Sequence, residues 1–226
     1  MSYPINYPTP QGANIQIFNA TGGTASSPKT ISTWVKPQGA SFVWFTLIGA
    51  GGGGDNSSAG GGSGAVTNCM VPAFLIPDSL QVYVGKGGDG VAGIAGEDTA
   101  IVYQQKDTSG YTLLTALHGD NAANGGSAST SNYFSCMGFF QSVAGQSGIV
   151  GGQTASTTTF LSGGGASGAT VGNYGYSAPC GYFQMQPIIV GVGGGGSGAL
   201  IGQGGIGCGG GYQGNGGNGL VVIITW

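Results

Sequence analysis

Residues 42–54 read FVWFTLIGAGGGG, an apolar run that passes directly into glycine. Residues 42–48 are apolar at nearly every position, so both faces of a strand formed by them should be buried, as in the centre of a sheet. Residues 220–226, LVVIITW, have the same character. A segment this apolar would aggregate if it were exposed, so we expect it to pair inside the sheet as well.

Six further runs rich in β-branched and aromatic residues have the length of strands. No window of a dozen residues shows helical spacing of apolar residues without a glycine interruption. Eight short strands predict an all-β fold, namely a β-sandwich or jelly roll. The predicted strands are residues 14–19, 30–35, 41–48, 65–72, 80–85, 99–104, 111–117 and 220–226.

Glycine makes up 52 of the 226 residues and is gathered into tracts between these strands. Collagen needs glycine at every third position and abundant proline, whereas this chain has clustered glycines and nine prolines, so a triple helix is excluded. Disordered chains are poor in apolar residues, but 40% of these residues are hydrophobic, so the chain should fold. The tracts are residues 49–64, 85–96, 119–126, 163–172, 191–198 and 202–219.

The tracts can either stay mobile or pack together. Ordering a residue costs about 1–2 kcal/mol of conformational entropy, and the cost is highest for glycine. If the tracts were linkers, no side-chain contacts would offset this cost. Polyglycine can form an extended left-handed helix of the polyproline II shape, and such helices can lie at backbone contact distance. We therefore predict a bundle of polyglycine II helices packed on the sandwich. Its packed positions include Gly51, Gly62, Gly88, Gly164, Gly194 and Gly210.

Charge is almost absent from the chain. Four lysines, no arginine and seven acidic residues give a net charge of −3, and residues 121–226 carry no charged side chain. Nucleic-acid binding depends on basic clusters, so no nucleic-acid partner is expected. The apolar runs are far shorter than the roughly 20 residues of a membrane helix, so no membrane insertion is expected. Sparse charge also predicts poor solubility as a free monomer, which indicates a subunit of a larger assembly.

The four cysteines, Cys69, Cys136, Cys180 and Cys208, are too far apart for a zinc knuckle. Residues 1–7 have neither a basic n-region nor an apolar h-region, so we expect no signal peptide and synthesis in a reducing cytoplasm. Buried free thiols are then the favoured interpretation, and one disulfide is the alternative.

Sequence motifs of catalysis and cofactor binding are either absent or lack the structural context that they require. Residues 49–54 formally satisfy the GxGxxG fingerprint of dinucleotide-binding proteins, but no helix is expected after them. His118 is the only histidine and no serine lies in a GxSxG elbow, so a structural or surface role is favoured for it. Asp89, Glu97 and Asp98 are interpreted as solvated loop acids rather than calcium ligands. We therefore expect no enzymatic activity, no cofactor and no metal.

Two charge-free stretches, residues 133–140 and 174–183, combine Tyr, Phe, Ser and Gly much as binding loops do. Burial in the core or against another subunit is the favoured interpretation, and recognition of an external ligand such as a glycan is the alternative. The candidate binding or subunit-contact residues are Tyr133, Phe134, Phe139, Phe140, Tyr174, Tyr176, Tyr182 and Phe183.

Residues 34–40, WVKPQGA, followed by the apolar run and glycines of residues 42–54, resemble the opening of the glycine-rich domain found in many bacteriophage and other viral virion proteins. PDSLQVYVG at residues 77–85 and GGNGLVVII at residues 216–224 follow in the family's order. The architecture is also similar to the extracellular glycine-rich region of the anaplastic lymphoma kinase receptor, a tumour-necrosis-factor-like sandwich carrying polyglycine helices. This resemblance implies the fold but not signalling.

Family members usually sit at the tips of tail fibres or form adhesin tips. We therefore expect a non-enzymatic virion structural protein, a homo-oligomer with a trimer favoured, located on the capsid surface or in a tail fibre beside other virion proteins. With few residues ahead of the domain and no coiled-coil or collagen-like shaft, a small stand-alone virion protein is favoured over a complete fibre.

The chain is predicted to divide into residues 1–29, an N-terminal arm with the first strand, and residues 30–226, the glycine-rich β-sandwich domain. The candidate docking arm carries Tyr3, Pro4, Tyr7 and Pro8. The alternative function is a host-attachment adhesin whose aromatic loops bind a glycan or protein of the host-cell surface. An ice-binding polyglycine bundle is disfavoured, because the sequence has no regular threonine array.

Overall fold

The computed structural model describes residues 13–54, 60–104, 110–121, 126–127, 129, 138–145, 147, 206–210 and 214–226. Within them the chain is nearly all β, as predicted, and the one helical element is the short 3-10 helix η1 (Ala73–Leu75). The strands are β1 (Asn14–Asn19), β2 (Thr30–Val35), β3 (Phe42–Ile48), β4 (Val66–Pro72), β5 (Ser79–Val84), β6 (Thr99–Tyr103), β7 (Tyr111–Ala116), β8 (Phe139–Val143) and β9 (Leu220–Thr225).

All eight predicted strands are present, and each boundary agrees to within one residue. Strand β8 was not predicted, although its residues belong in part to one of the two aromatic stretches. It is a short strand of five residues that follows Gly138, and its polar Gln141 and Ser142 interrupt the apolar pattern. An isolated strand of this length has too weak a periodicity to be distinguished from a loop.

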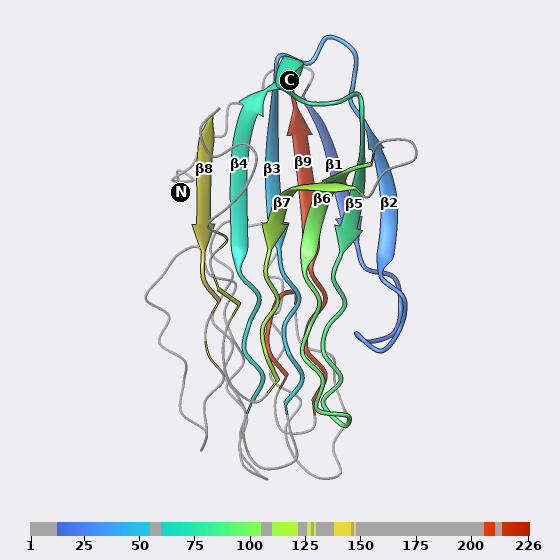
Figure 1. The fold of residues 1–226 in the computed structure, drawn as a ribbon, viewed down its shortest axis with the longest axis vertical. Helices are drawn as coiled ribbons and strands as arrows, with labels where there is room; N and C mark the ends of the chain where they lie inside the picture. Colours follow the sequence, from blue (N-terminus) through green and yellow to red (C-terminus); the bar gives the residue numbers. More distant parts are fainter. Residues whose placement is uncertain are drawn as a thin grey trace, which may run out of the picture.

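The strands form two antiparallel sheets (Figure 1). The five-stranded sheet has the order β1-β9-β3-β4-β8, and the four-stranded sheet has the order β2-β5-β6-β7. Strand β3 pairs with β4 and β9, and β9 pairs with β1 and β3. The two most apolar strands therefore lie in the interior of a sheet, as their sequences predicted.

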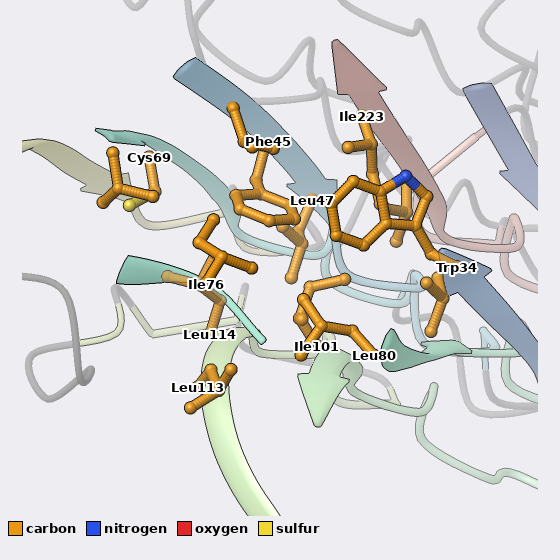
Figure 2. Packing of buried hydrophobic residues seen from close by; sticks show 14 of the residues in the cluster. Trp34, Phe45, Leu47, Cys69, Ile76, Leu80, Ile101, Leu113, Leu114 and Ile223 are labelled. Carbon is orange, nitrogen blue, oxygen red and sulfur yellow. The ribbon is translucent and has the colours of Figure 1, made fainter. Parts of the chain in front are cut away.

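The facing sides of the two sheets enclose a hydrophobic core (Figure 2). Phe45 and Leu47 of β3 meet Leu80 of β5 and Ile101 of β6, and all four are at most 1% exposed. Trp34 of β2 lies edge-on to Phe45, with ring centroids 6.1 Å apart. Burying each such side chain stabilises the fold by about 1.5–3 kcal/mol, so this sandwich-like core is a large part of the driving force for folding.

The outer face of β3 is less enclosed than its sequence predicted. Thr46 and Ile48 are 2% and 7% exposed, but Phe42 is 40% exposed. The prediction that both faces of residues 42–48 are buried is therefore wrong at the Phe42 end. Phe42 begins β3 at the end of the sheet remote from the glycine-rich segments, where it stacks on Trp226 with ring centroids 6.1 Å apart but is not enclosed.

The glycine-rich connections extend from one end of the sandwich (Figure 1). Strands β3, β5, β7 and β8 run towards this end, and β4, β6 and β9 return from it, as the antiparallel pairing requires. The glycine-poor connections at residues 36–41 and 73–78 lie at the opposite end. The topology thus gathers glycine segments from distant parts of the sequence into one layer.

Candidate functional site

The glycine-rich segments at this end lie against one another and exchange backbone hydrogen bonds. Residues 49–54 and 60–65 are buried along their whole length. In this glycine layer, main-chain atoms therefore fill the space between neighbouring segments, whereas side chains fill the space between the sheets of the sandwich. The described segments that take part in it include residues 49–54, 60–65, 85–90, 94–97, 117–121, 206–210 and 214–219, and Gly126 and Gly145 bond to its edge.

Residues 49–54 lie at the centre of the glycine layer. Their N–H groups donate to three segments in turn, so that donors three residues apart reach the same segment. All three acceptor segments run antiparallel to residues 49–54, because the acceptor number falls by three as the donor number rises by three. The bonds are Gly49 to Ala65 (2.9 Å) and Gly52 to Gly62 (2.9 Å), Ala50 to Glu97 (3.3 Å) and Gly53 to Ile94 (3.1 Å), and Gly51 to Gly217 (2.9 Å) and Gly54 to Gly214 (3.0 Å).

The carbonyl groups of the same segment accept from three further stretches of chain. Ala50 O accepts from Gly119, Gly51 O from Gly88 and Gly52 O from Gly210, at 2.8–2.9 Å. Residues 49–54 are therefore hydrogen-bonded in six directions around their length. The pattern recurs between residues 60–65 and 206–210, where N–H groups three residues apart, Gly61 and Gly64, donate to Gly210 and Gly207 at 2.9 and 2.8 Å.

The layer leaves no room for side chains at the predicted packing positions Gly51, Gly88 and Gly210. A Cβ atom on Gly51 would overlap the carbonyl of Cys208, one on Gly88 the carbonyl of Ile94, and one on Gly210 the carbonyl of Gly214. Gly62 donates its N–H to Asp120 O at 2.9 Å. Gly164 and Gly194 lie outside the described residues.

Two asparagine side chains that were not predicted as functional residues bond to the glycine layer. Asn218 Oδ1 accepts the N–H of Gly87 at 2.9 Å, and Asn215 Oδ1 accepts the N–H of Gly90 at 3.0 Å. The two asparagines are three residues apart, and both side chains bond to residues 87–90, so they lie on the same side of residues 214–219. This spacing in the run NGGNG was the available sequence signal.

Of the aromatic candidates, the structure describes Phe139 and Phe140, on opposite faces of β8. Phe139 is 44% exposed and stacks on Trp44 of β3, with ring centroids 5.6 Å apart. Phe140 is partly buried and packs against the main core. The other aromatic candidates are Tyr133, Phe134, Tyr174, Tyr176, Tyr182 and Phe183; like the docking-arm residues Tyr3, Pro4, Tyr7 and Pro8, they lie outside the described residues.

His118 forms an ion pair where the sandwich meets the glycine layer. Its Nδ1 lies 2.6 Å from Asp98 Oδ1, its backbone N–H donates to the same oxygen at 2.9 Å, and its Nε2 lies 3.8 Å from Asp120 Oδ1. The bond to Asp98 raises the pKa of His118 in spite of partial burial. Burial acts to raise the pKa of Asp98, but the hydrogen bonds and charge of His118 outweigh it and lower that pKa. The pair ties the segment after β7 to the segment before β6.

Cys69 of β4 is a free thiol in the core, and its burial raises its pKa to about 12. Such a thiol is chemically inert as long as the sandwich stays folded. Cys208 is also buried, with Sγ 3.6 Å from Ile206 O. Cys136 and Cys180 lie outside the described residues.

Across the described ranges, no group of three or more His, Cys, Asp or Glu side chains is arranged to hold a metal ion. None of the helical structure in the same ranges is long and apolar enough to cross a membrane.

No protein-family model matches the sequence, and a search of curated proteins finds no relative.

Proposed function

We propose that the chain is a non-enzymatic structural subunit of a virus particle, in which a jelly-roll sandwich of the tumour-necrosis-factor-like type carries a bundle of polyglycine II helices. The observation that carries this proposal is the three-residue repeat of hydrogen-bond partners along residues 49–54.

The repeat supports the helical form of the glycine segments. A β-strand alternates with a period of two and pairs with at most two neighbours in its sheet. A polyproline II helix has about three residues per turn, so N–H groups three residues apart point to the same neighbour. The pairs Gly49 and Gly52, and Gly51 and Gly54, behave in this second way.

The number of neighbours supports a bundle. Three segments accept hydrogen bonds from residues 49–54 and three stretches donate to them, so a central helix would be surrounded on all sides. Packing this close leaves no room for a Cβ at positions such as Gly51, where the added atom would overlap the neighbouring main chain. The bundle would be stiff because its polar backbone groups are paired away from water.

The family resemblance of residues 34–54, 77–85 and 216–224 supports the assignment to a virion. The low charge supports a subunit role, since the seven acids and four lysines are few for a freely soluble chain of 226 residues. A stiff rod of backbone fixed to one end of a sandwich suits a part that carries mechanical load. The expected assembly is a homo-oligomer, with a trimer favoured, beside other virion proteins and docked through residues 1–12.

Quantitative mass spectrometry of purified particles of the virus that encodes this chain tests the proposal. We expect the chain at a fixed copy number per particle, and deletion of residues 1–12 should remove it from particles while the rest stays folded. A chain that is abundant in infected cells but missing from gradient-purified particles would overturn the virion role. Particles that keep the truncated chain at wild-type occupancy would overturn the docking arm alone.

A further inference from the structure

We propose that the ammonium group of Lys86 binds a compact oxyanion, such as phosphate or sulfate, at the glycine-rich end of the sandwich. The site lies between the segment that follows β5 and residues 20–29, which connect β1 to β2 at this end (Figure 1). The inference goes beyond the proposed function, because anion binding does not depend on a place in a virus particle.

Lys86 is the one charged residue of the described ranges that is buried, at 5% exposure. Glu97 holds its main chain in place: the N–H of Lys86 donates to Glu97 Oε2 at 3.2 Å, and its carbonyl accepts from the N–H of Glu97 at 3.0 Å. Lysine is almost never fully buried unless its charge is paired, because an ammonium that leaves water without a partner loses its hydration. The burial of Lys86 therefore calls for a negative partner.

Within the described part of the chain, this ammonium has no such partner. No carboxylate oxygen lies within 4.0 Å of Lys86 Nζ, and no hydrogen bond joins Nζ to an acceptor. The neighbouring Asp89 is engaged elsewhere, since Oδ1 accepts the N–H groups of Val91 and Ala92 at 3.0 Å each. Its Oδ2 accepts from Thr24 Oγ1 at 3.4 Å. The positive charge of Lys86 is thus left for a ligand.

The ammonium is also within reach of solvent. Among the described residues, the one unpartnered side-chain nitrogen or oxygen atom that is sealed from solvent is Trp34 Nε1. Lys86 Nζ, which is likewise unpartnered, therefore keeps an opening although the rest of its side chain is covered. The ammonium lies beside the exposed Gly23, where an added Cβ would be 3.7 Å from Nζ.

Ser27 supplies a second donor at the same place. The added Cβ on Gly23 would lie 2.5 Å from Ser27 Oγ as well as 3.7 Å from Lys86 Nζ, so the hydroxyl and the ammonium flank one side of Gly23. The N–H of Ala25 donates to the carbonyl of Gly87 at 2.8 Å, which fixes residues 20–29 against the segment that carries the lysine. One bound ligand can therefore meet both donors.

An oxyanion supplies what this site lacks. The unpaired groups, an ammonium and a hydroxyl, are donors, whereas the carboxylates of Asp89 and Glu97 already accept hydrogen bonds. A ligand that offers negative oxygens makes charge-assisted hydrogen bonds, which are about twice as strong as neutral ones. The two carboxylates repel an anion from a greater distance, which limits its affinity. A small ligand that stays close to Lys86 fits these conditions.

Isothermal titration calorimetry of the full chain with sodium phosphate at low ionic strength tests the inference. We expect one phosphate per chain, with a Kd of about 1 mM. Lys86→Met keeps an unbranched apolar side chain but removes the ammonium, so it should weaken binding at least about tenfold. Should Lys86→Met fail to fold, Ser27→Ala takes its place, with an expected loss of about fivefold.

Lys29→Met is the matched control. Lys29 is an exposed lysine at the end of the same connection, and its replacement changes the net charge of the chain by the same amount. Because exposed charges interact weakly, the Kd for phosphate should change by less than about twofold. A wild-type chain without saturable binding up to about 20 mM phosphate overturns the inference. A Lys86→Met chain that binds phosphate as tightly as the wild type overturns it as well.

Titration with methyl phosphate distinguishes two sources of the same oxyanion. Binding as tight as that of inorganic phosphate identifies an ester carried by a larger molecule as a ligand that can enter the site. Weaker binding of methyl phosphate identifies the free anion as the ligand. Neither result bears on the virion role, which is tested by the composition of purified particles.

Discussion

In the sandwich, side chains such as Phe45 and Leu47 fill the space between two sheets, whereas in the glycine layer residues such as Gly51 and Gly210 bring main chains into direct contact. The sandwich is stabilised mainly by the apolar area that it buries. The glycine layer buries little side-chain area, and its order depends on paired backbone groups. The sandwich should therefore be sensitive to the removal of atoms, and the glycine layer to their addition.

Adding one methyl group in the centre of the glycine layer should have the largest effect. In Gly51→Ala, the new Cβ would overlap the Cys208 carbonyl, which is backbone and cannot rotate away. We expect the free energy of unfolding to fall by at least about 4 kcal/mol, beyond the usual range for overpacking. Urea denaturation followed by circular dichroism measures this change.

Gly22→Ala is the control for the Gly51 variant. Gly22 has a φ of +52°, but a Cβ at this position would point into open space, so only the left-handed backbone is penalised, at about 1–2 kcal/mol. Equal losses at Gly22 and Gly51 would show that close packing is not what the glycine layer requires.

Removing atoms from the sandwich should have the next largest effect. Phe45 is fully buried and packs against Trp34, so Phe45→Ala should lower the free energy of unfolding by about 3–4 kcal/mol through lost burial and a cavity. Differential scanning calorimetry should show a lower Tm. Phe74→Ala is the control, because Phe74 is 82% exposed, and a similar Tm loss there would argue against the core described above.

Removing one side-chain bond to the glycine layer should have a smaller effect. Asn218→Ala deprives the N–H of Gly87 of its acceptor, so we expect a loss of about 1–2 kcal/mol in the free energy of unfolding. The control is Asn19→Ala, at the exposed end of β1. Chemical denaturation of the two variants compares their free energies of unfolding. An Asn218 variant as stable as the Asn19 variant would contradict a role for this side chain in the layer.

The ion pair between the two regions should have the smallest effect. The pKa of His118 is raised above 6.5, so its stabilisation is present below pH 6.5 and is lost as the pH rises through the raised pKa. The pKa of Asp98 is lowered below 3.8, so its stabilisation is present above pH 3.8 and is lost as the pH falls through the lowered pKa. The side chains are 34% and 37% exposed, so solvent screening keeps the effect below about 1 kcal/mol.

Thermal melts of the wild type and Asp98→Asn from pH 5 to pH 9 measure this contribution as the difference in Tm, over a range of about four pH units around the ordinary histidine pKa. The Tm of the wild type should exceed that of the variant at low pH, and this difference should shrink as the pH rises. A difference in Tm that grows with pH would contradict the pairing of His118 with Asp98.

Local pattern was enough to predict the strands, because β3 and β9 are apolar runs bounded by glycine and polar residues. It was not enough for β8, which is short and partly polar, or for the roles of Asn215 and Asn218, whose partners Gly90 and Gly87 are more than a hundred residues away. Nor could it predict that Phe42 stays exposed while Ile48 is buried, since the two occupy the same face of one strand. Such differences depend on which other segments pack nearby.

Side-chain pattern and composition are sufficient to establish that this protein is nearly all β, that residues 42–48 and 220–225 lie inside a sheet, and that charge is scarce. The position of β9 between β1 and β3, and the meeting of glycine-rich segments at one end of the sandwich, are properties of the folded chain alone. Glycine has no side chain with which to encode a partner. Its neighbours are set by the strands that carry it into place.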